Sequence, residues 1–314
     1  KRESILLGNG FIIHIKGTYY FAFLKLFDGI VCEIAIRANI FHEAYSLYAQ
    51  NDTMYIMKSG MITGKYSTEE IDSVIFYNPL ATANTVSDYD GNIYKTVTIG
   101  TQTWMAENLR TTHYADGSPI PKVSDIPGWD ALLDIDPAYC WYNDDSTSNA
   151  AVYGALYTWE ATMNGEASSN SVPSEVQGVC PSGWHVPSLE EWAILQNYLI
   201  LHGYNFDGTA LGNKIGKSVA ATSHWRFSSE EGSVGNTDHS AYRNKSGFSA
   251  LPGGYRDQWG ASLYLENETY WWTSTDMDGS AWLRSIYFFS TSFMVLPTLC
   301  YYKENGVSVR CLED

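Results

Sequence analysis

Residues 187–203 read PSLEEWAILQNYLILHG, and this stretch predicts the longest helix of the chain. Ser188 is followed three residues later by Glu191, which is the pattern of a capping box at a helix N-terminus. Four large apolar residues recur at helical spacing: Leu189, Trp192, Leu195 and Leu199. They predict one buried helix face, and Gly203 predicts the stop. Such a stripe belongs to the protein core rather than to a cofactor site.

A second helix is predicted upstream, over residues 152–164 (VYGALYTWEATMN). Leu156, Trp159 and Met163 recur there with helical spacing and form an apolar stripe. This pattern also indicates core packing.

Residues 86–109 predict a pair of strands around the Asp90-Gly91 turn, because Asp-Gly favours the positive backbone φ of a hairpin. Asp88, Asp90 and Asn92 also match the start of a calcium-binding loop. The complete motif needs a glutamate near the end of the loop, whereas position 99 is isoleucine. We therefore interpret this segment as a turn.

Downstream of the main helix, short β-favouring runs alternate with turn residues. They cover residues 247–256, 269–276, 280–290 and 305–314. A hairpin, two helices and then a series of strands predict an α+β fold, with helices beside an antiparallel sheet.

Charge and composition divide the chain near residue 84. Residues 1–83 are close to neutral, with 7 Lys/Arg and 8 Asp/Glu, whereas residues 84–314 carry 12 and 27. Residues 78–85 (NPLATANT) have linker composition, so we predict an N-terminal segment (1–83) and a main domain (84–314). The net charge of −16 disfavours binding to nucleic acid. No apolar run is long enough to predict a transmembrane span.

The N-terminal segment is predicted to carry a small β element. Residues 52–78 contain two β-favouring runs around Ser59-Gly60, which predict a hairpin, then a helical turn starting at Ser67 and a strand over 72–77. Residues 11–36 only partly resemble an export signal, because charged residues interrupt them. Cys32 follows Val31 rather than a small residue, so a buried thiol is expected there and a lipid anchor is the alternative.

Five cysteines are present: Cys32, Cys140, Cys180, Cys300 and Cys311. Four of them lie in the main domain and allow three pairings if they are oxidised. None has zinc-finger spacing, which argues against a structural zinc site.

Seven ordered motifs carry a resemblance to a known family: residues 88–121, 139–145 (YCWYNDD), 153–161 (YGALYTWEA), 180–192 (CPSGWHVPSLEEW), 246–257 (SGFSALPGGYRD), 270–276 (YWWTSTD) and 305–314 (NGVSVRCLED). Together they resemble the Fibrobacter succinogenes major paralogous domain. That family is bacterial and is found on exported or surface proteins, so the resemblance implies an extracellular or outer-membrane location. The family is also similar to formylglycine-generating (sulfatase-modifying) enzymes, which implies a C-type-lectin-like domain.

The resemblance bears on the cysteines. Formylglycine-generating enzymes use two nearby cysteines to bind copper, and soft thiolates suit Cu(I). The nearest pair here, Cys300 and Cys311, is separated by ten intervening residues. We therefore expect structural cysteines and predict that Cys180 pairs with Cys311 and Cys140 with Cys300. His185 is expected to be a packed, hydrogen-bonded residue rather than a catalytic base.

In lectin-like domains the ligand and calcium sites lie in the irregular second half. The corresponding acidic and amide residues here are Glu266, Asn267, Glu268, Asp276 and Asp278. Their oxygens are suitable calcium ligands. The aromatic residues expected to stack on a sugar are Tyr255, Trp271, Trp272 and Trp282. The alternative is that the tryptophans are core residues and the acids are turn residues.

We therefore expect a noncatalytic secreted or surface protein that binds a glycan or a surface protein, with calcium as an optional cofactor. Membrane attachment, where it exists, is expected through an upstream lipid anchor. The alternatives are an oxidase like the formylglycine-generating enzymes and a structural component of a surface assembly.

Overall fold

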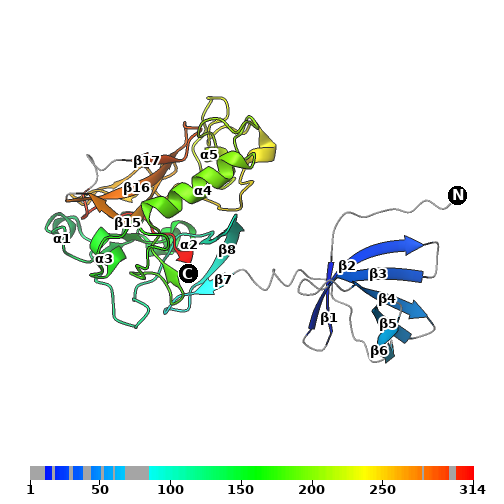
Figure 1. The fold of residues 1–314 in the computed structure, drawn as a ribbon. Coiled ribbons are helices and arrows are strands. Elements are labelled where there is room, and N and C mark those ends of the chain that lie inside the picture. Colours follow the sequence, from blue (N-terminus) through cyan, green and yellow to red (C-terminus); the bar gives the residue numbers. More distant parts are fainter. Residues whose placement is uncertain are drawn as a thin grey trace. The chain divides into compact units, whose positions relative to one another are not determined.

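A computed structural model of the chain divides it into two compact units, Lys1–Asn84 and Thr85–Asp314. In the first unit the structure describes only the backbone of six strands. In the second it describes residues 85–277, 279–296 and 302–314, with side chains except at 296. Figure 1 shows the elements of both units. In these described parts, no helix is long and apolar enough to cross a membrane.

The first unit contains one antiparallel sheet in which strands that are consecutive in sequence are neighbours. Its strands are β1 (Phe11–Ile15), β2 (Thr18–Phe27), β3 (Val31–Arg37), β4 (Ala44–Gln50), β5 (Thr53–Lys58) and β6 (Met61–Ser67). Lys58 pairs with Met61, so β5 and β6 form the predicted hairpin. Cys32 lies in β3. The predicted strand over 72–77 and the helical turn after Ser67 lie outside the described residues.

The second unit combines a few short helices with antiparallel sheets, as the α+β prediction requires. Its helices are α1 (Ile126–Asp130), η3 (Tyr142–Asp144), α2 (Ser146–Tyr153), α3 (Trp159–Met163), α4 (Leu189–Leu201), α5 (Gly216–Val219) and η4 (Ser240–Tyr242). Its strands are β7 (Thr85–Ser87), β8 (Ile93–Ile99), β9 (Gln102–Met105), β10 (Tyr139–Cys140), β11 (Leu156–Tyr157), β12 (Trp184–His185), β13 (Tyr255–Arg256), β14 (Ser262–Leu263), β15 (Glu268–Met277), β16 (Ser280–Tyr287), β17 (Met294–Leu296) and β18 (Leu312–Glu313).

The strands of this unit form two main sheets. One has the order β12-β18-β9-β8-β7 and the other the order β15-β16-β17, and two small two-stranded ladders join β10 to β11 and β13 to β14. Every ladder is antiparallel. Helix α4 packs against β8 of the first sheet and against β15 and β16 of the second (Figure 1).

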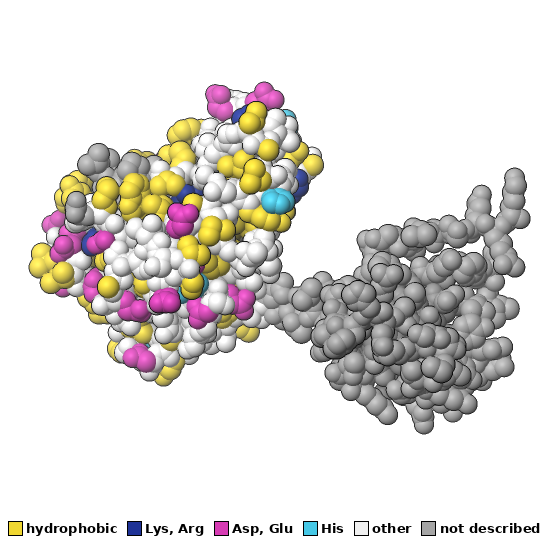
Figure 2. Space-filling view, viewed as in Figure 1, with side chains coloured by type: hydrophobic (Ala, Val, Ile, Leu, Met, Phe, Trp, Pro, Cys, Tyr) yellow, Lys and Arg dark blue, Asp and Glu magenta, His cyan; other side chains and the backbone are white. Residues whose placement is uncertain are grey.

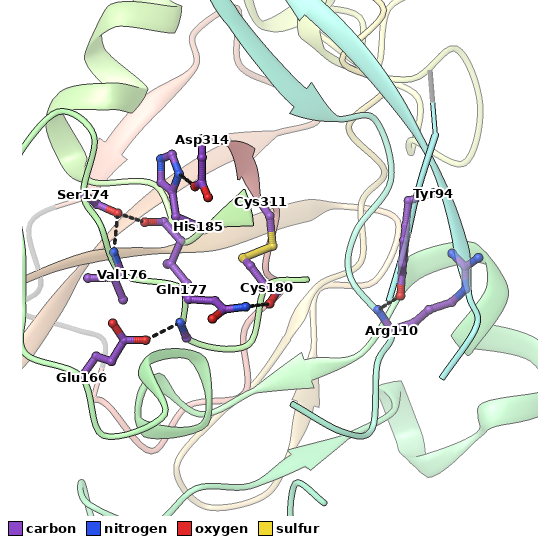
Figure 3. Close-up of a disulfide and its surroundings, with 12 residues drawn as sticks. Tyr94, Arg110, Glu166, Ser174, Val176, Gln177, Cys180, His185, Cys311 and Asp314 are labelled. Atoms are coloured by element: carbon purple, nitrogen blue, oxygen red, sulfur yellow. Dashed lines mark hydrogen bonds and ion pairs between the residues drawn. A yellow bond between two sulfur atoms is a disulfide. The ribbon is translucent and has the colours of Figure 1, made fainter. Parts of the chain in front are cut away.

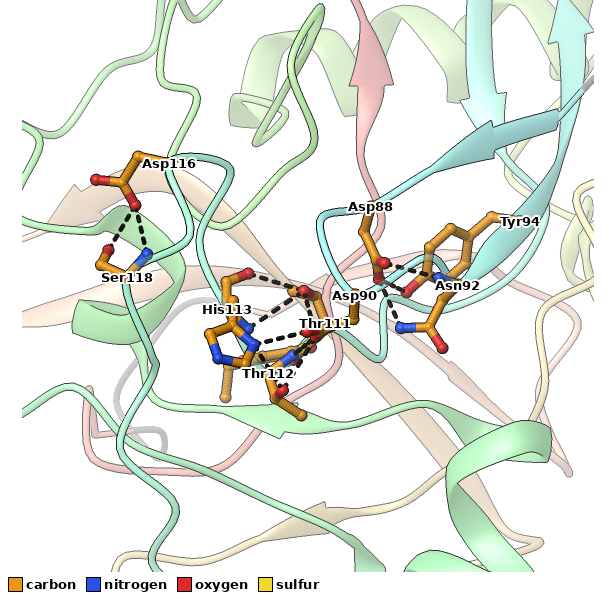
Figure 4. A network of polar contacts seen from close by, with 10 residues as sticks. Asp88, Asp90, Asn92, Tyr94, Thr111, Thr112, His113, Asp116 and Ser118 are labelled. Carbon is orange, nitrogen blue, oxygen red and sulfur yellow. Dashed lines mark hydrogen bonds and ion pairs between the residues drawn. The ribbon is translucent and has the colours of Figure 1, made fainter.

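The turn around Asp90-Gly91 forms as predicted, because β7 and β8 pair antiparallel across it and Gly91 has a φ of +79°. Figure 4 shows how its carboxylates are used. Asp88 accepts hydrogen bonds from the Tyr94 hydroxyl at 2.5 Å and from Asn92. Asp90 lies 2.6 Å from His113 Nδ1 and accepts hydrogen bonds from Thr112. Both carboxylates therefore stabilise the turn, which confirms its interpretation as a structural feature.

The prediction of one continuous helix over residues 152–164 is wrong. Helix α2 ends at Tyr153, β11 follows, and α3 begins only at Trp159. Gly154 breaks the helix with a φ of +80°, and a Cβ there would lie 2.6 Å from the carbonyl oxygen of Leu109. The apolar stripe is nevertheless buried, because Leu156 points into the core from a strand and Trp159 from a separate helix.

The predicted main helix is confirmed as α4. Its capping box is formed, since the Ser188 hydroxyl accepts a hydrogen bond from the Glu191 amide and the Glu191 carboxylate accepts one from the Ser188 amide. Trp192, Leu195 and Leu199 are fully buried, whereas Leu189 is half-buried at the first turn.

The predicted strands over 269–276 and 280–290 correspond to β15 and β16. The other two predicted strands are largely irregular. In residues 247–256 only β13 is a strand, and Gly254 (φ +62°) needs the glycine conformation, because a Cβ would lie 2.2 Å from the carbonyl oxygen of Leu263. Residues 305–314 make single bridges with three different partners before β18, so they run between the sheets rather than along one.

Two hydrophobic clusters lie on opposite faces of β15. Tyr270 and Trp272 belong to one cluster, and Trp271 belongs to the other, with Trp192 of α4. Successive side chains of a strand point to opposite faces, so a strand covered on both sides buries every residue.

Candidate functional site

The predicted disulfide between Cys180 and Cys311 is present (Figure 3). Both cysteines are fully buried and belong to the same hydrophobic cluster as Tyr270. The bond connects the segment before α4 to the segment that leads into β18. These two cysteines are therefore structural.

The predicted bridge between Cys140 and Cys300 is contradicted, because Cys140 is a free thiol. It lies fully buried in a small cluster with Trp129 and Leu156. Burial is the main cause that raises the pKa of this thiol to about 12, although the nearby Arg256 acts in the opposite direction. Cys300 lies outside the described residues.

His185 is packed and hydrogen-bonded, as expected. Its Nε2 lies 2.9 Å from a Glu191 carboxylate oxygen, and its Nδ1 lies 2.7 Å from an Asp314 carboxylate oxygen. Burial alone would lower the pKa of His185, but these two carboxylates outweigh it and raise the pKa above the usual value. A cleft of about 390 Å³ opens beside it, lined in part by Trp184 and Asp314. Both ring nitrogens of His185 are therefore held by carboxylates of the protein itself.

Trp271 and Trp272 do not face solvent, so their predicted role in stacking on a ligand is wrong. Both are fully buried in the two clusters on either side of β15. Their indole nitrogens donate hydrogen bonds to the Asn108 side chain and to the carbonyl oxygen of Tyr157, respectively. Trp282, the fourth predicted aromatic residue, lies in β16 and is half-buried.

The predicted calcium ligands do not converge. Glu268 and Asp276 lie eight residues apart on β15, which corresponds to about 26 Å along a strand. A calcium ion binds its ligands at about 2.3–2.6 Å, so these two carboxylates cannot share one ion. Asp276 contacts Lys303 at 3.2 Å, and Asp278 lies outside the described residues. In the part of the second unit that the structure describes, no group of three or more acidic, histidine or cysteine residues could hold a metal.

Four of the predicted residues, Tyr255, Glu266, Asn267 and Glu268, do lie together, at the start of β15. Around them is a row of aromatic rings that we call the aromatic strip: Tyr264, Tyr255, Tyr270, Tyr287 and Phe289. Centroid distances between successive rings of this row are 6.0, 5.2, 6.0 and 5.7 Å. The two ends are the most accessible, since Tyr264 is 49% exposed and Phe289 is 50% exposed.

Strand register explains how this strip forms. Glu268 lies directly opposite Tyr287 in the β15–β16 ladder, and Tyr270 follows Glu268 two residues later on the same face. Tyr270 is buried, while Tyr287 and Tyr255 are half-buried and pack against the same cluster. The strip is therefore the margin of a core cluster that reaches the protein surface. Figure 2 shows hydrophobic side chains gathered over β16 and β17 in this view.

Polar groups accompany the rings. The Glu268 carboxylate accepts a hydrogen bond from the Tyr270 hydroxyl, and burial raises its pKa. Asn267 accepts a hydrogen bond from the exposed Arg226 at 3.3 Å. The pKa of Tyr255 is raised to about 12, first by burial and then by the negative charges of its neighbours. The Tyr255 hydroxyl therefore stays protonated at physiological pH.

The loop before β15 holds two side chains in an uncommon backbone conformation. Tyr264 has a φ of +62° and Glu266 a φ of +63°, a region that residues other than glycine rarely occupy. The Tyr264 carbonyl oxygen accepts hydrogen bonds from the amides of Asn267 and Glu268, which fixes this turn. Such conformations cost on the order of 1–3 kcal/mol each and concentrate at functional sites.

Sequence reasoning missed Tyr264, Tyr287 and Phe289. Tyr264 lies two residues from the predicted Glu266, so a wider window would have included it. Tyr287 joins the strip because β16 pairs with β15, and Phe289 follows it just beyond the end of β16. The sequence does not reveal this pairing of strands.

Comparisons with known proteins identify the family. The model of the Fibrobacter succinogenes major domain matches residues 97–313, which is well over half of the chain. No curated protein and no solved structure matches the chain. The comparisons do not extend the relationship to the formylglycine-generating enzymes. The matched range nevertheless contains β9, α4 and all strands from β10 to β18, and so the chain belongs to the Fibrobacter succinogenes major domain family.

Proposed function

We propose that the second unit is a noncatalytic glycan-binding domain of a secreted or surface-attached bacterial protein, and that the aromatic strip is its binding surface. The observation that carries this proposal is the continuous row of rings from Tyr264 to Phe289. Half-exposed aromatic rings next to a carboxylate and an amide offer both kinds of contact that a sugar needs.

The first kind of contact is apolar. Tyr264 and Phe289 are about half-exposed, so each offers aromatic surface on which the C–H face of a sugar can stack. Tyr264 is stacked on Tyr255 with an interplanar angle of 25°, so its ring is supported by a second ring.

The second kind of contact is polar. Hydroxyl groups of a sugar can donate to the Glu268 carboxylate and accept from the exposed Arg226 guanidinium. Hydrogen bonds to charged groups are stronger than those between neutral groups. A few polar groups among apolar ones are typical of ligand sites, because they fix orientation and give specificity.

The structural cysteines support an exported, binding protein. Disulfides form and persist in oxidising compartments, and Cys180 and Cys311 are bonded to each other. A buried thiol whose pKa is about 12 stays protonated, which makes Cys140 a poor nucleophile and copper ligand. A C-type-lectin-like architecture and a lipid anchor upstream remain predictions that accord with this function.

The test measures binding of the whole chain to neutral oligosaccharides, first on a glycan array and then by calorimetry. We expect Tyr264→Ala and Phe289→Ala each to weaken binding by about 2- to 12-fold, because one aromatic contact contributes about 0.5–1.5 kcal/mol. The matched control is Tyr89→Ala, which removes a tyrosine of similar exposure (59%) from the turn between β7 and β8. Retained affinity in both strip variants, or the same loss in the control, would contradict the proposal.

A further inference from the structure

We infer that the aromatic strip selects neutral glycans and rejects acidic ones such as uronic acid polymers. This inference rests on the proposed glycan-binding function and specifies its ligand class. It follows from the charges around the strip rather than from the rings themselves.

The charged side chains that act on Tyr255 are acidic. Asp257 follows Tyr255 by two residues, and the carbonyl oxygen of Glu268 accepts a hydrogen bond from the Gly254 amide, so both acids lie beside it. Burial is the main cause that raises the pKa of the Tyr255 phenol, and these two acids raise it further. Glu266 is exposed in the same loop, two residues before Glu268. Arg226 is the cation that contacts this loop, and its guanidinium is shared between the Asn267 side chain and the Phe288 ring, whose centroid is 5.4 Å away. The strip and the loop before β15 therefore carry three carboxylates, those of Asp257, Glu266 and Glu268, and one guanidinium that is already engaged.

The rest of the second unit also carries a net negative charge. Residues 84–314 carry 27 acidic against 12 basic side chains, and Figure 2 shows acidic side chains along much of the visible margin. An acidic oligosaccharide therefore meets repulsion on approach as well as at the strip. A neutral oligosaccharide meets neither.

The size of the effect follows from Coulomb's law. One carboxylate about 6 Å from a ligand carboxylate lowers affinity by about 3-fold in bulk water and by about 100-fold at the effective dielectric constant that is typical of pairs near a protein surface. The bulk-water value is the minimum, so we expect at least about 3-fold weaker binding of an acidic ligand. Salt screens such repulsion over about 8 Å at physiological ionic strength, so the difference should shrink as salt is raised.

The experiment compares two forms of one ligand, hexagalacturonate as the free acid and the same oligomer with all carboxyl groups methyl-esterified. Their sugar rings are identical, and esterification replaces each carboxylate by an uncharged methyl ester; the salt dependence separates the effect of charge from that of the added methyl groups. Calorimetry with the full chain is expected to show at least about 3-fold tighter binding of the ester at 50 mM salt, and a smaller ratio at 500 mM. Glu266→Gln should lower that ratio further, whereas Tyr264→Ala should weaken both forms and leave the ratio unchanged.

The outcomes separate this inference from the function on which it rests. Equal or tighter binding of the free acid, with both forms still dependent on Tyr264, would overturn the charge selectivity and leave glycan binding intact. If neither form binds and the neutral oligosaccharides of the array also fail to bind, the proposed function is wrong and the selectivity is wrong with it.

Discussion

Removal of the Cys180–Cys311 disulfide is expected to cost the second unit about 5 kcal/mol of stability. The two cysteines are 131 residues apart, and in the chain-entropy model a cross-link of this length removes roughly 17 cal/mol/K of entropy from the unfolded chain. The double variant Cys180→Ala/Cys311→Ala loses this restriction. Domains are commonly stable by only about 5–15 kcal/mol, so the variant should lie close to the limit of folding.

Urea unfolding followed by tryptophan fluorescence measures this loss. All 11 tryptophans lie after residue 84, so the signal reports the second unit alone. Free energies must be extrapolated to water rather than compared at the midpoint, because removing a cross-link also changes the surface exposed on unfolding and hence the slope. Cys140→Ala is the control, since it removes a buried sulfur that holds no cross-link. A double variant within about 1 kcal/mol of the wild type would refute the reasoning.

Three further predictions concern stability. Folding raises the pKa of His185, so protonation of this side chain stabilises the folded state. The stabilisation is complete below the unfolded pKa near 6.5 and is lost as pH rises through the folded pKa. In urea unfolding, His185→Gln should therefore lose more free energy of unfolding relative to the wild type at pH 5.5 than at pH 9. Gly154→Ala should destabilise by about 2 kcal/mol more than Gly183→Ala in thermal unfolding, because both have a φ near +80° but only Gly154 places a Cβ against a backbone oxygen. Tyr94→Phe should cost about 1–3 kcal/mol, because it leaves Asp88 without a buried donor, whereas the exposed Tyr89→Phe should be neutral in the same assay.

The parts of the fold that the sequence predicted are those specified by local chemistry. The capping box at Ser188 and the stripe from Trp192 to Leu199 specify α4 without reference to any other element. Asp90-Gly91 likewise specifies the turn between β7 and β8, because only the turn residues themselves are involved. The disulfide between Cys180 and Cys311 is different, because it was predicted in the light of the family resemblance and not from local chemistry.

The failures have a physical cause in tertiary packing. Leu156, Trp159 and Met163 have helical spacing, but the spacing arises from a strand followed by a separate short helix. Gly154 interrupts the stretch because the chain passes close to Leu109 there, a contact between segments far apart in sequence. Periodicity records which residues are buried, and it does not record by which element they are buried.

Sequence periodicity was equally insufficient to predict the candidate site. A pair of adjacent tryptophans in a strand is expected to place one ring in the core and one in solvent, since neighbours alternate between faces. That expectation fails for Trp271 and Trp272 because the sheet is covered on both faces. The predicted acidic and amide residues lie together only where they are contiguous in sequence, from Glu266 to Glu268, whereas β15 separates them from Asp276.

The position of the strip relative to the core suits the binding role that we propose for it. Tyr270 anchors the middle of the row in the cluster that also contains the disulfide, and Tyr255 and Tyr287 pack against that cluster. Their rings are therefore already ordered, and a ligand that stacks on the strip need not immobilise them. Ordering a side chain on binding costs about 0.5–1.5 kcal/mol, so the fixed rings retain affinity that a mobile surface would lose. Tyr264 and Phe289, at the exposed ends, carry the remaining freedom, and it is there that substitutions should separate binding from stability.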